Sequence, residues 1–170
     1  MGARSKARKR ALDVLYSAEL RGETPLAAYE RMAGQGNGFA NPYTEVVVRG
    51  VVAEQARIDA LLSAHSEGWT LGRMPAVDRN VLRIGAWEII AAQPDVPAEV
   101  AMSEAIALVR DLSTDESPTF VNGLLGAIAR AVAEDDEVEA ELQAEVDAQP
   151  QVEVEAEPNE PVSAEQARPA

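Results

Sequence analysis

The chain contains no cysteine at any of its 170 positions. This absence excludes a disulfide framework, a thiolate metal site and a cysteine nucleophile, and it fits a reducing cytoplasm. No apolar stretch follows the basic N-terminus, so a signal peptide is not expected. No run reaches the roughly 18 apolar residues of a membrane-spanning helix, so a membrane association is not expected either.

Aromatic residues and histidine are also scarce. Aromatics make up 4% of the chain, and the one histidine, His65, falls on the apolar side of an expected helix, which indicates a structural role. The glycine-rich segment 34–38 lacks the Lys-Ser/Thr ending of a phosphate-binding loop. No pattern assembles a nucleophile, a base and an orienting group. The sequence therefore predicts neither enzymatic activity nor a metal or cofactor site.

Helix patterns recur along the chain, whereas strand patterns are sparse. A first helix is expected from a Ser5 cap to about Arg21, with Gly22 ending it. Three further starts combine a capping side chain with a following proline: Thr24-Pro25, Asn41-Pro42 and Ser117-Pro118. A single long helix is expected over 41–66. The segment 77–92 is apolar almost all round, which is typical of a central helix packed on several sides.

Charge divides the chain into two expected domains. Residues 1–133 carry 14 basic and 16 acidic side chains, a net of −2. Residues 134–170 carry one arginine and 13 acids, a net of −12, with four prolines and few large apolar side chains. This composition offers too little apolar surface to offset the entropy of ordering. We predict a helical domain over 1–133 and a disordered acidic tail over 134–170, with a short helical extension through Leu142 as an alternative.

The basic run near the N-terminus is the strongest chemical feature of the sequence. Its five cations are Arg4, Lys6, Arg8, Lys9 and Arg10. On a helix they recur one turn apart, an arrangement that suits phosphates along an RNA strand and gains from counterion release. Short basic runs also occur as solvated helix ends. From these residues alone, RNA binding and simple solubility stay open as alternatives.

Three blocks of the sequence resemble the NusB family of bacterial transcription antitermination factors. They are ARKRALDVLYSAELRG at 7–22, VDRNVLRIGAWEI at 77–89 and VAMSEAIALVRDLSTDESPTFVNGLLGAI at 100–128. The FVNG string is the most specific of these matches. The resemblance spans roughly residues 3–132, and the acidic tail is not part of the shared pattern.

The resemblance implies an all-α fold, and the helix patterns give six to seven helices. The family arranges them in two small helical subdomains around the central apolar helix. It also implies that the protein binds the boxA element of nascent ribosomal RNA with NusE, a small-subunit ribosomal protein. The two would join the RNA polymerase antitermination complex and support processive transcription.

Site residues follow from the positions that match the family. The basic run corresponds to its RNA-contacting motif, and Tyr16 to a tyrosine on the RNA side of the same helix. The other residues implied at RNA are Glu116, Ser117 and Phe120. Glu116 would repel phosphate, so Glu116→Gln is expected to strengthen boxA binding. Asp78 matches an acidic position at the NusE contact, with a first-turn helix acid as the alternative.

Several questions stay open at the level of sequence. Arg83 either reaches RNA or pairs with an acidic neighbour. The tail either competes with RNA for the basic helix or is a solvated appendage. Two other functional classes resemble this one: the NusB-like domain that precedes some ribosomal RNA methyltransferases, and a protein scaffold that self-associates as a homodimer. No cofactor-binding pattern follows the helical region, which disfavours the first of these.

Overall fold

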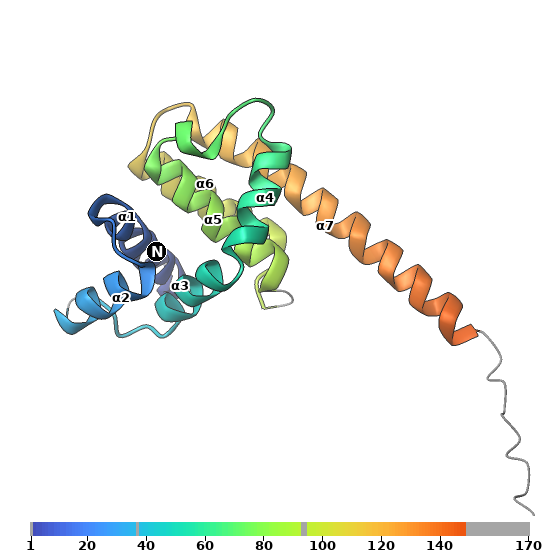
Figure 1. Cartoon of the computed structure of the whole chain (residues 1–170), viewed down its shortest axis with the longest axis horizontal. Coiled ribbons are helices and arrows are strands. Elements are labelled where there is room, and N and C mark those ends of the chain that lie inside the picture. Colours follow the sequence, from blue (N-terminus) through green and yellow to red (C-terminus); the bar gives the residue numbers. More distant parts are fainter. Residues whose placement is uncertain (1, 37, 93–94, 149–170) are drawn as a thin grey trace, which may run out of the picture. The chain divides into compact units, whose positions relative to one another are not determined.

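The computed structural model describes residues 2–36, 38–92 and 95–148, with side chains up to residue 144. Over these residues the chain is all-α, as predicted (Figure 1). No helix in the described ranges has the length and apolar character to span a bilayer. The elements are α1 (Ala3–Arg21), α2 (Pro25–Gly34), α3 (Tyr43–Ala53), α4 (Gln55–His65), the short 3₁₀ helix η1 (Leu71–Arg73), α5 (Ala76–Ala91), α6 (Ala98–Leu112) and α7 (Ser117–Ala148).

Helix ends follow the capping chemistry at two of the expected starts. The Ala27 amide donates to Thr24 Oγ1 at 3.2 Å, and the Tyr43 amide donates to Asn41 Oδ1 at 3.0 Å. Gly22 ends α1 in the left-handed region, at a φ of 64°. The expected Ser5 cap is wrong, because α1 begins earlier, after Gly2, and Ser5 instead donates a hydrogen bond to Glu104.

The long helix expected over 41–66 is two helices. Glu54 lies between α3 and α4 with φ and ψ of −103° and 9°, outside the helical region. The apolar residues Val47, Val51, Ile58 and Leu62 keep a helical spacing across the break and are all buried. Hydrophobic periodicity therefore predicted the buried face correctly and missed the interruption of the backbone.

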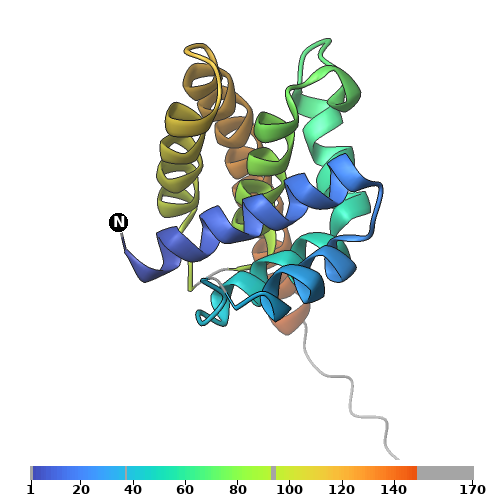
Figure 2. The ribbon, with the colours of Figure 1, turned by 90° about the vertical axis from the view of Figure 1, so that its left-hand side faces the viewer.

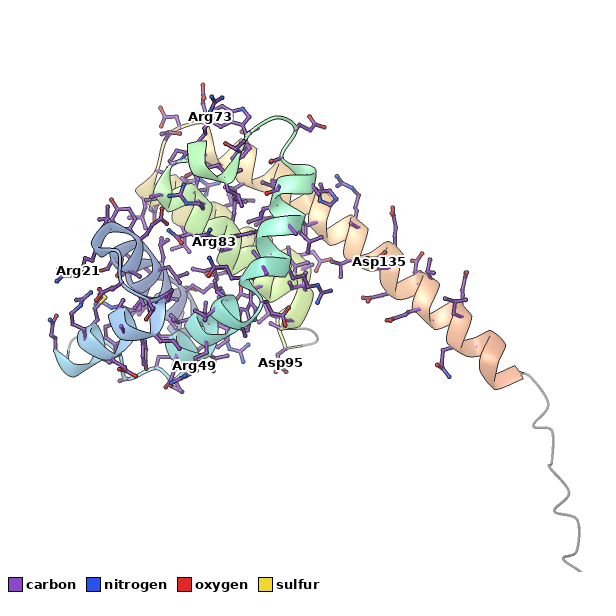
Figure 3. The ribbon with its side chains drawn as sticks, in the orientation of Figure 1. Arg21, Arg49, Arg73, Arg83, Asp95 and Asp135 are labelled. Carbon is purple, nitrogen blue, oxygen red and sulfur yellow. The ribbon has the colours of Figure 1, made fainter. Side chains whose placement is uncertain are left out.

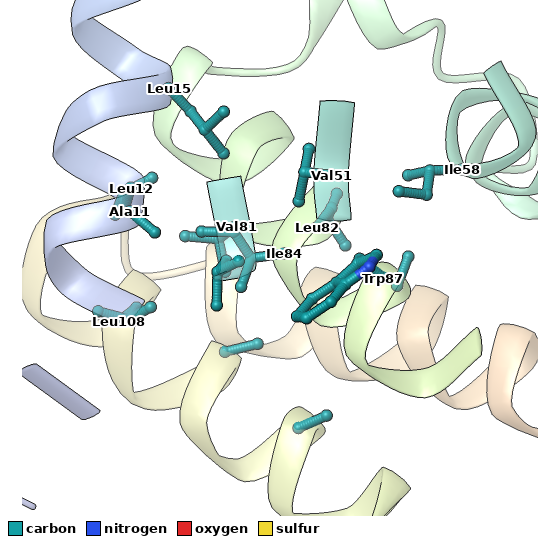
Figure 4. Packing of buried hydrophobic residues seen from close by; sticks show 14 of the residues in the cluster. Ala11, Leu12, Leu15, Val51, Ile58, Val81, Leu82, Ile84, Trp87 and Leu108 are labelled. Atoms are coloured by element: carbon teal, nitrogen blue, oxygen red, sulfur yellow. The ribbon is translucent and has the colours of Figure 1, made fainter. Parts of the chain in front are cut away.

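The core surrounds α5, as the apolar segment predicted. This helix packs against α1, α3, α4 and α6. Figure 2 shows α1 lying across it, and Figure 4 shows Val81, Leu82, Ile84 and Trp87 of α5 among side chains from α1, α3, α4 and α6. A Cβ added to Gly85 would lie 2.7 Å from Leu125 Cδ1, so the absent side chain lets α7 approach α5 closely.

Helix α7 continues beyond the expected domain boundary. It runs to Ala148, so residues 134–148 are helical where a disordered segment was expected to begin. Backbone contacts group Met1–Asp136 into one compact unit and Glu137–Ala170 into a second. In the second unit Val138 and Leu142 are exposed. The remainder of the predicted tail, 149–170, lies outside the described residues.

Candidate nucleic-acid interface

The basic N-terminal helix presents four of its five cations at the surface. Arg4, Lys6 and Lys9 are exposed, and Arg10 is half-buried. Arg4 donates to the Asp95 carbonyl oxygen at 3.2 Å, and Arg10 lies 3.4 Å from an Asp13 carboxylate oxygen. Burial raises the pKa of the Asp13 carboxyl, and Arg10 and Lys9 oppose this shift. We call Arg4, Lys6, Lys9 and Arg10 the basic surface.

Arg8 does not belong to this surface. Its side chain is 3% exposed, and its Nε donates to the Glu88 Oε1 and Oε2 atoms at 2.8 and 3.1 Å. Its Nη1 lies 3.4 Å from Glu104 Oε2, and its guanidinium packs over the Tyr43 ring at 5.6 Å. The expectation that Arg8 is presented to phosphate is therefore wrong, because its charge is already neutralised inside the protein.

Tyr43 completes this buried cluster and was not singled out in the sequence. Its hydroxyl donates to Glu88 Oε1 at 2.5 Å, and the Arg4 guanidinium lies over its ring at 5.1 Å. Burial, followed by the hydrogen bond to Glu88 and the charge of that carboxylate, raises the pKa of the phenol above its ordinary value. Arg8, Tyr43, Glu88 and Glu104 thus join α1, α3, α5 and α6.

Two features of the sequence could have revealed this cluster. Arg8 precedes Leu12 by one helical turn and Leu15 by two, so it shares their inward face. Glu88 lies ten residues after Asp78, the other carboxylate of the helix that the sequence marks as buried all round, and only apolar residues flank it within three positions on either side. A buried charge is retained only where it is paired and hydrogen-bonded. The inward-facing Arg8 and the buried Glu88 are therefore expected to form an ion pair with each other.

Tyr16, which the resemblance implies at RNA, lies at the surface of α1. It is 37% exposed and stands seven residues after Lys9, which places both on the same side of α1. Arg83, by contrast, pairs with an acidic neighbour: its Nε and Nη2 donate to the two Asp59 carboxylate oxygens at 2.8 and 3.0 Å. Its side chain is 15% exposed, and Figure 3 shows it on the middle of α5. Of the two alternatives for Arg83, the ion pair is the one in the structure.

Asp78 and Ser117 are buried together. The Ser117 hydroxyl donates to Asp78 Oδ2 at 2.8 Å and so links the start of α7 to the first turn of α5. Their exposures are 3% and 2%. The expectation of an exposed carboxylate at Asp78 is wrong, and the Ser117 hydroxyl faces inward. A role of Asp78 at NusE stays a prediction, and it requires that a partner reach into the protein.

An open pocket leads to this buried pair. It has a volume of about 540 Å³ and is lined by Trp69, Arg73, Asp78, Glu116, Ser117 and Phe120, among others. The Trp69 and Phe120 rings form its aromatic side, with centroids 6.2 Å apart and an angle of 49° between planes. We call it the Trp69 pocket. It brings together four residues implied by the resemblance and adds Trp69 and Arg73, which sequence reasoning did not place there.

The basic surface and the Trp69 pocket lie toward opposite ends of α1. The C-terminal half of α1 reaches η1 through Glu19, which pairs with Arg79, and Arg79 in turn donates to the carbonyl oxygens of Leu71 and Met74. In Figure 2 the connection from α4 to α5 and the loop from α6 to α7 lie at the same end of the helical bundle.

The family model, the similar sequences and the similar solved structures all indicate the same family. The model described as the NusB family matches residues 5–130. The transcription antitermination protein NusB of Nocardioides sp. is 65% identical over 130 residues, which cover 76% of this chain and 96% of that protein. The solved structure of T. maritima NusB superposes with a TM-score of 0.69 at 31% identity, covering 80% of this chain and 96% of the other.

A further solved structure contains the antitermination factors NusB and NusE in complex with double-stranded RNA. It superposes with a TM-score of 0.67 at 30% identity and covers 77% of this chain and 98% of the matched chain. The family-model match, 5–130, includes all three sequence blocks.

Proposed function

The chain belongs to the NusB family, and from that premise we propose that it is an RNA-binding transcription antitermination factor without a chemical step. It binds the boxA element of nascent ribosomal RNA together with NusE and supports processive transcription by RNA polymerase. The relative solved with NusE and RNA supports these two partners. The observation that carries the proposal is the set of exposed cations on α1, which stands apart from the buried ion pairs nearby.

RNA affinity in this proposal comes from the basic surface. Each neutralised phosphate of a single strand contributes roughly 0.7 to the slope of log affinity against log salt. Four cations therefore give a slope of about −3. They supply attraction with little sequence choice, because phosphate contacts position a protein without reading bases.

The test replaces two cations that make no internal ion pair among the described residues, Lys6→Gln with Lys9→Gln. Binding of boxA RNA should weaken, and the salt slope should flatten by about 1.4. Arg57→Gln on α4, a cation that is 60% exposed, is the matched control and should leave both quantities unchanged. If the double variant keeps the affinity and slope of the parent chain, the RNA site lies elsewhere.

Glu116 provides a second test with the opposite sign. Its carboxylate is exposed at the rim of the Trp69 pocket, where it repels phosphate. Glu116→Gln should therefore strengthen boxA binding at low salt, and the gain should shrink as salt screens the charge. An unchanged or weaker affinity at matched salt contradicts this role. Measuring the mass in solution with and without NusE and boxA RNA separates the adaptor from a homodimeric scaffold.

A further inference from the structure

The glycine-rich loop between α2 and α3 lies beside the basic surface. The structure describes this loop at residues 35–36 and 38–42, and both helices that it joins pack against α1. Its glycines Gly36 and Gly38 have left-handed backbones, with φ values of 79° and 84°. Glycine adopts this region without the steric cost that a side chain adds. The backbone conformation alone therefore accounts for a glycine at each of the two positions.

Gly38 meets a second requirement, which Gly36 does not share. A Cβ added to Gly38 would lie 2.6 Å from Nε and 2.8 Å from Nη2 of Arg10, closer than nonbonded heavy atoms approach each other. The Arg10 guanidinium therefore occupies space that a side chain at position 38 would fill. Nothing lies within 4 Å of a Cβ added to Gly36. The two glycines thus share a backbone conformation and differ in their contact with α1.

The chain that follows Gly38 is anchored to the folded domain. The Phe39 ring packs edge-on against Tyr29 of α2, with centroids 5.6 Å apart and an angle of 73° between planes. Asn41 Nδ2 donates to the Ala3 carbonyl oxygen at 2.9 Å, which ties the loop to the first residue of α1. The backbone that faces the guanidinium is therefore held in place by two contacts with different helices.

Arg10 differs from the lysines of the basic surface because its side chain is held. Its Nη1 lies 3.4 Å from Asp13 Oδ2, and its Nε and Nη2 face Gly38, yet the side chain is still 42% exposed. Lys6 and Lys9 are exposed and form no ion pair within the described residues. Lys6 precedes Arg10 by one helical turn, so the two present charge to the same stretch of a strand. A held guanidinium loses less side-chain freedom on binding than a free lysine does.

We propose that Gly38 is a positioning residue of the RNA site: its missing side chain lets Arg10 lie against the loop between α2 and α3, where the guanidinium is held for a phosphate of the RNA. This inference rests on the RNA-binding function proposed above and adds a residue that carries no charge. Arg10 contacts the phosphate, and Gly38 acts only through Arg10. A side chain at position 38 keeps the number of cations and removes the fixed position of one. RNA affinity should therefore fall while the salt slope, which counts neutralised phosphates, stays the same.

The test makes the same substitution at the two glycines. Gly38→Ala should weaken the binding of boxA RNA about threefold at low salt, within the range that ordering one long side chain costs. Gly36→Ala is the matched control and should keep the affinity of the parent chain, because its Cβ meets nothing. Both variants place a Cβ at positive φ, so their urea midpoints should fall by similar amounts. Equal RNA affinities of the two variants overturn the proposal.

A double-mutant cycle separates positioning of Arg10 from a general effect on the loop. Arg10→Gln alone should weaken binding and flatten the salt slope by about 0.7. In the Arg10→Gln chain, Gly38→Ala should have no further effect on RNA affinity, because the group that it displaces is absent. A further loss in that chain shows that Gly38 acts by another route and overturns the proposal.

A second substitution covers the case in which the alanine variant does not fold. Asparagine is among the side chains that best tolerate the left-handed region, and it carries the same Cβ. Gly38→Asn should therefore weaken boxA binding by a similar factor, and Gly36→Asn is its control. The absence of any difference between these two asparagine variants also contradicts the positioning role.

The remaining outcomes distinguish this inference from the function on which it rests. If Lys6→Gln with Lys9→Gln weakens boxA binding as expected but Arg10→Gln does not, the positioning role fails and the RNA-binding function stands. If neither the lysine double variant nor Arg10→Gln changes the affinity or the salt slope, both the positioning role and the proposed RNA site fail.

Discussion

Glu88 shows how one charged residue can be tolerated in the centre of an apolar helix. It is 1% exposed, and it receives hydrogen bonds from Arg8 and Tyr43. The pair is not in itself evidence of high stability, because removing two charges from water is costly. What the geometry does imply is that removing either charge leaves the other buried and unpaired, which is costly.

The corresponding prediction compares single and paired replacements. Glu88→Ala should lower the free energy of unfolding by about 3–5 kcal/mol, because Arg8 is left charged and unpaired. Replacing both residues by apolar side chains, Arg8→Met with Glu88→Leu, should cost much less. Urea denaturation of the three chains measures the difference. A double variant as unstable as the single one would show that packing, and not the uncompensated charge, dominates.

Tyr43 should make the protein less stable as the pH rises into the alkaline range. Folding raises the pKa of its phenol, so the unfolded chain loses the proton first as pH rises past about 10. The stabilising contribution is therefore complete below the unfolded pKa and is lost as pH rises toward the folded one. The melting temperature of the parent chain should fall more between about pH 9 and about pH 11 than that of Tyr43→Phe. Tyr29 titrates in both chains, so parallel curves would contradict the assignment.

At the level of helices, close approach between α3 and α5 depends on a glycine. A Cβ added to Gly50 would overlap the indole of Trp87, whose side chain is confined by the core. Gly50→Ala should therefore destabilise the protein by about 1–3 kcal/mol, the usual cost of overpacking. Gly34→Ala at the end of α2, where nothing lies within 4 Å of the added Cβ, is the control. Urea midpoints of both variants test this, and equal midpoints would show that Trp87 can move aside.

Hydrophobic spacing and caps were sufficient to predict which segments are helical and which face inward. They were not sufficient to find the break at Glu54, because the apolar pattern continues through it. The extent of α7 was also missed: its acidic, alanine-rich stretch to Ala148 has good helix formers but no large apolar face to pack. Helix propensity alone accounts for the added turns, whereas the low hydrophobicity of the stretch is typical of disorder.

The sequence predicted the positions of the site residues less accurately than the positions of the helices. Of the residues that the family positions implied at RNA, Glu116 and Tyr16 are exposed and Phe120 is half-buried. The family positions misplaced Arg8, Asp78 and Ser117, which are buried because each completes a contact with a residue far away in the sequence. Such partners cannot be read from local spacing. Trp69 is 55% exposed, and nothing in the local sequence pattern indicated that it lines a pocket.

On the scale of the whole molecule, charge is distributed unevenly along the chain. The last described buried side chain is Ile128, whereas the net charge of −12 lies after residue 133. A chain ending at Ala133 should therefore unfold with the same free energy as the full chain, within about 0.5 kcal/mol. Thermal or urea unfolding checks this. A larger loss would show that the acidic segment supports the fold.

The same truncation decides between the two interpretations of the tail. If the tail competes with RNA for the basic surface, its removal strengthens RNA binding at low salt, and the gain disappears once salt screens the charges. If it is a solvated appendage, the affinity is unchanged at every salt concentration. Both measurements use the chain that ends at Ala133.

The buried cluster around Arg8 also bears on hydrogen exchange. The first turns of a terminal helix normally open by local fraying, and their amides exchange with solvent quickly. Here α1 cannot lift away without leaving the carboxylate of Glu88 in the core without its counter-charge. Opening of these turns is therefore coupled to disruption of α3, α5 and α6. The amides around Arg8 should exchange as slowly as those of the central helix, and the cations that flank Arg8 are held in position on a backbone that rarely opens.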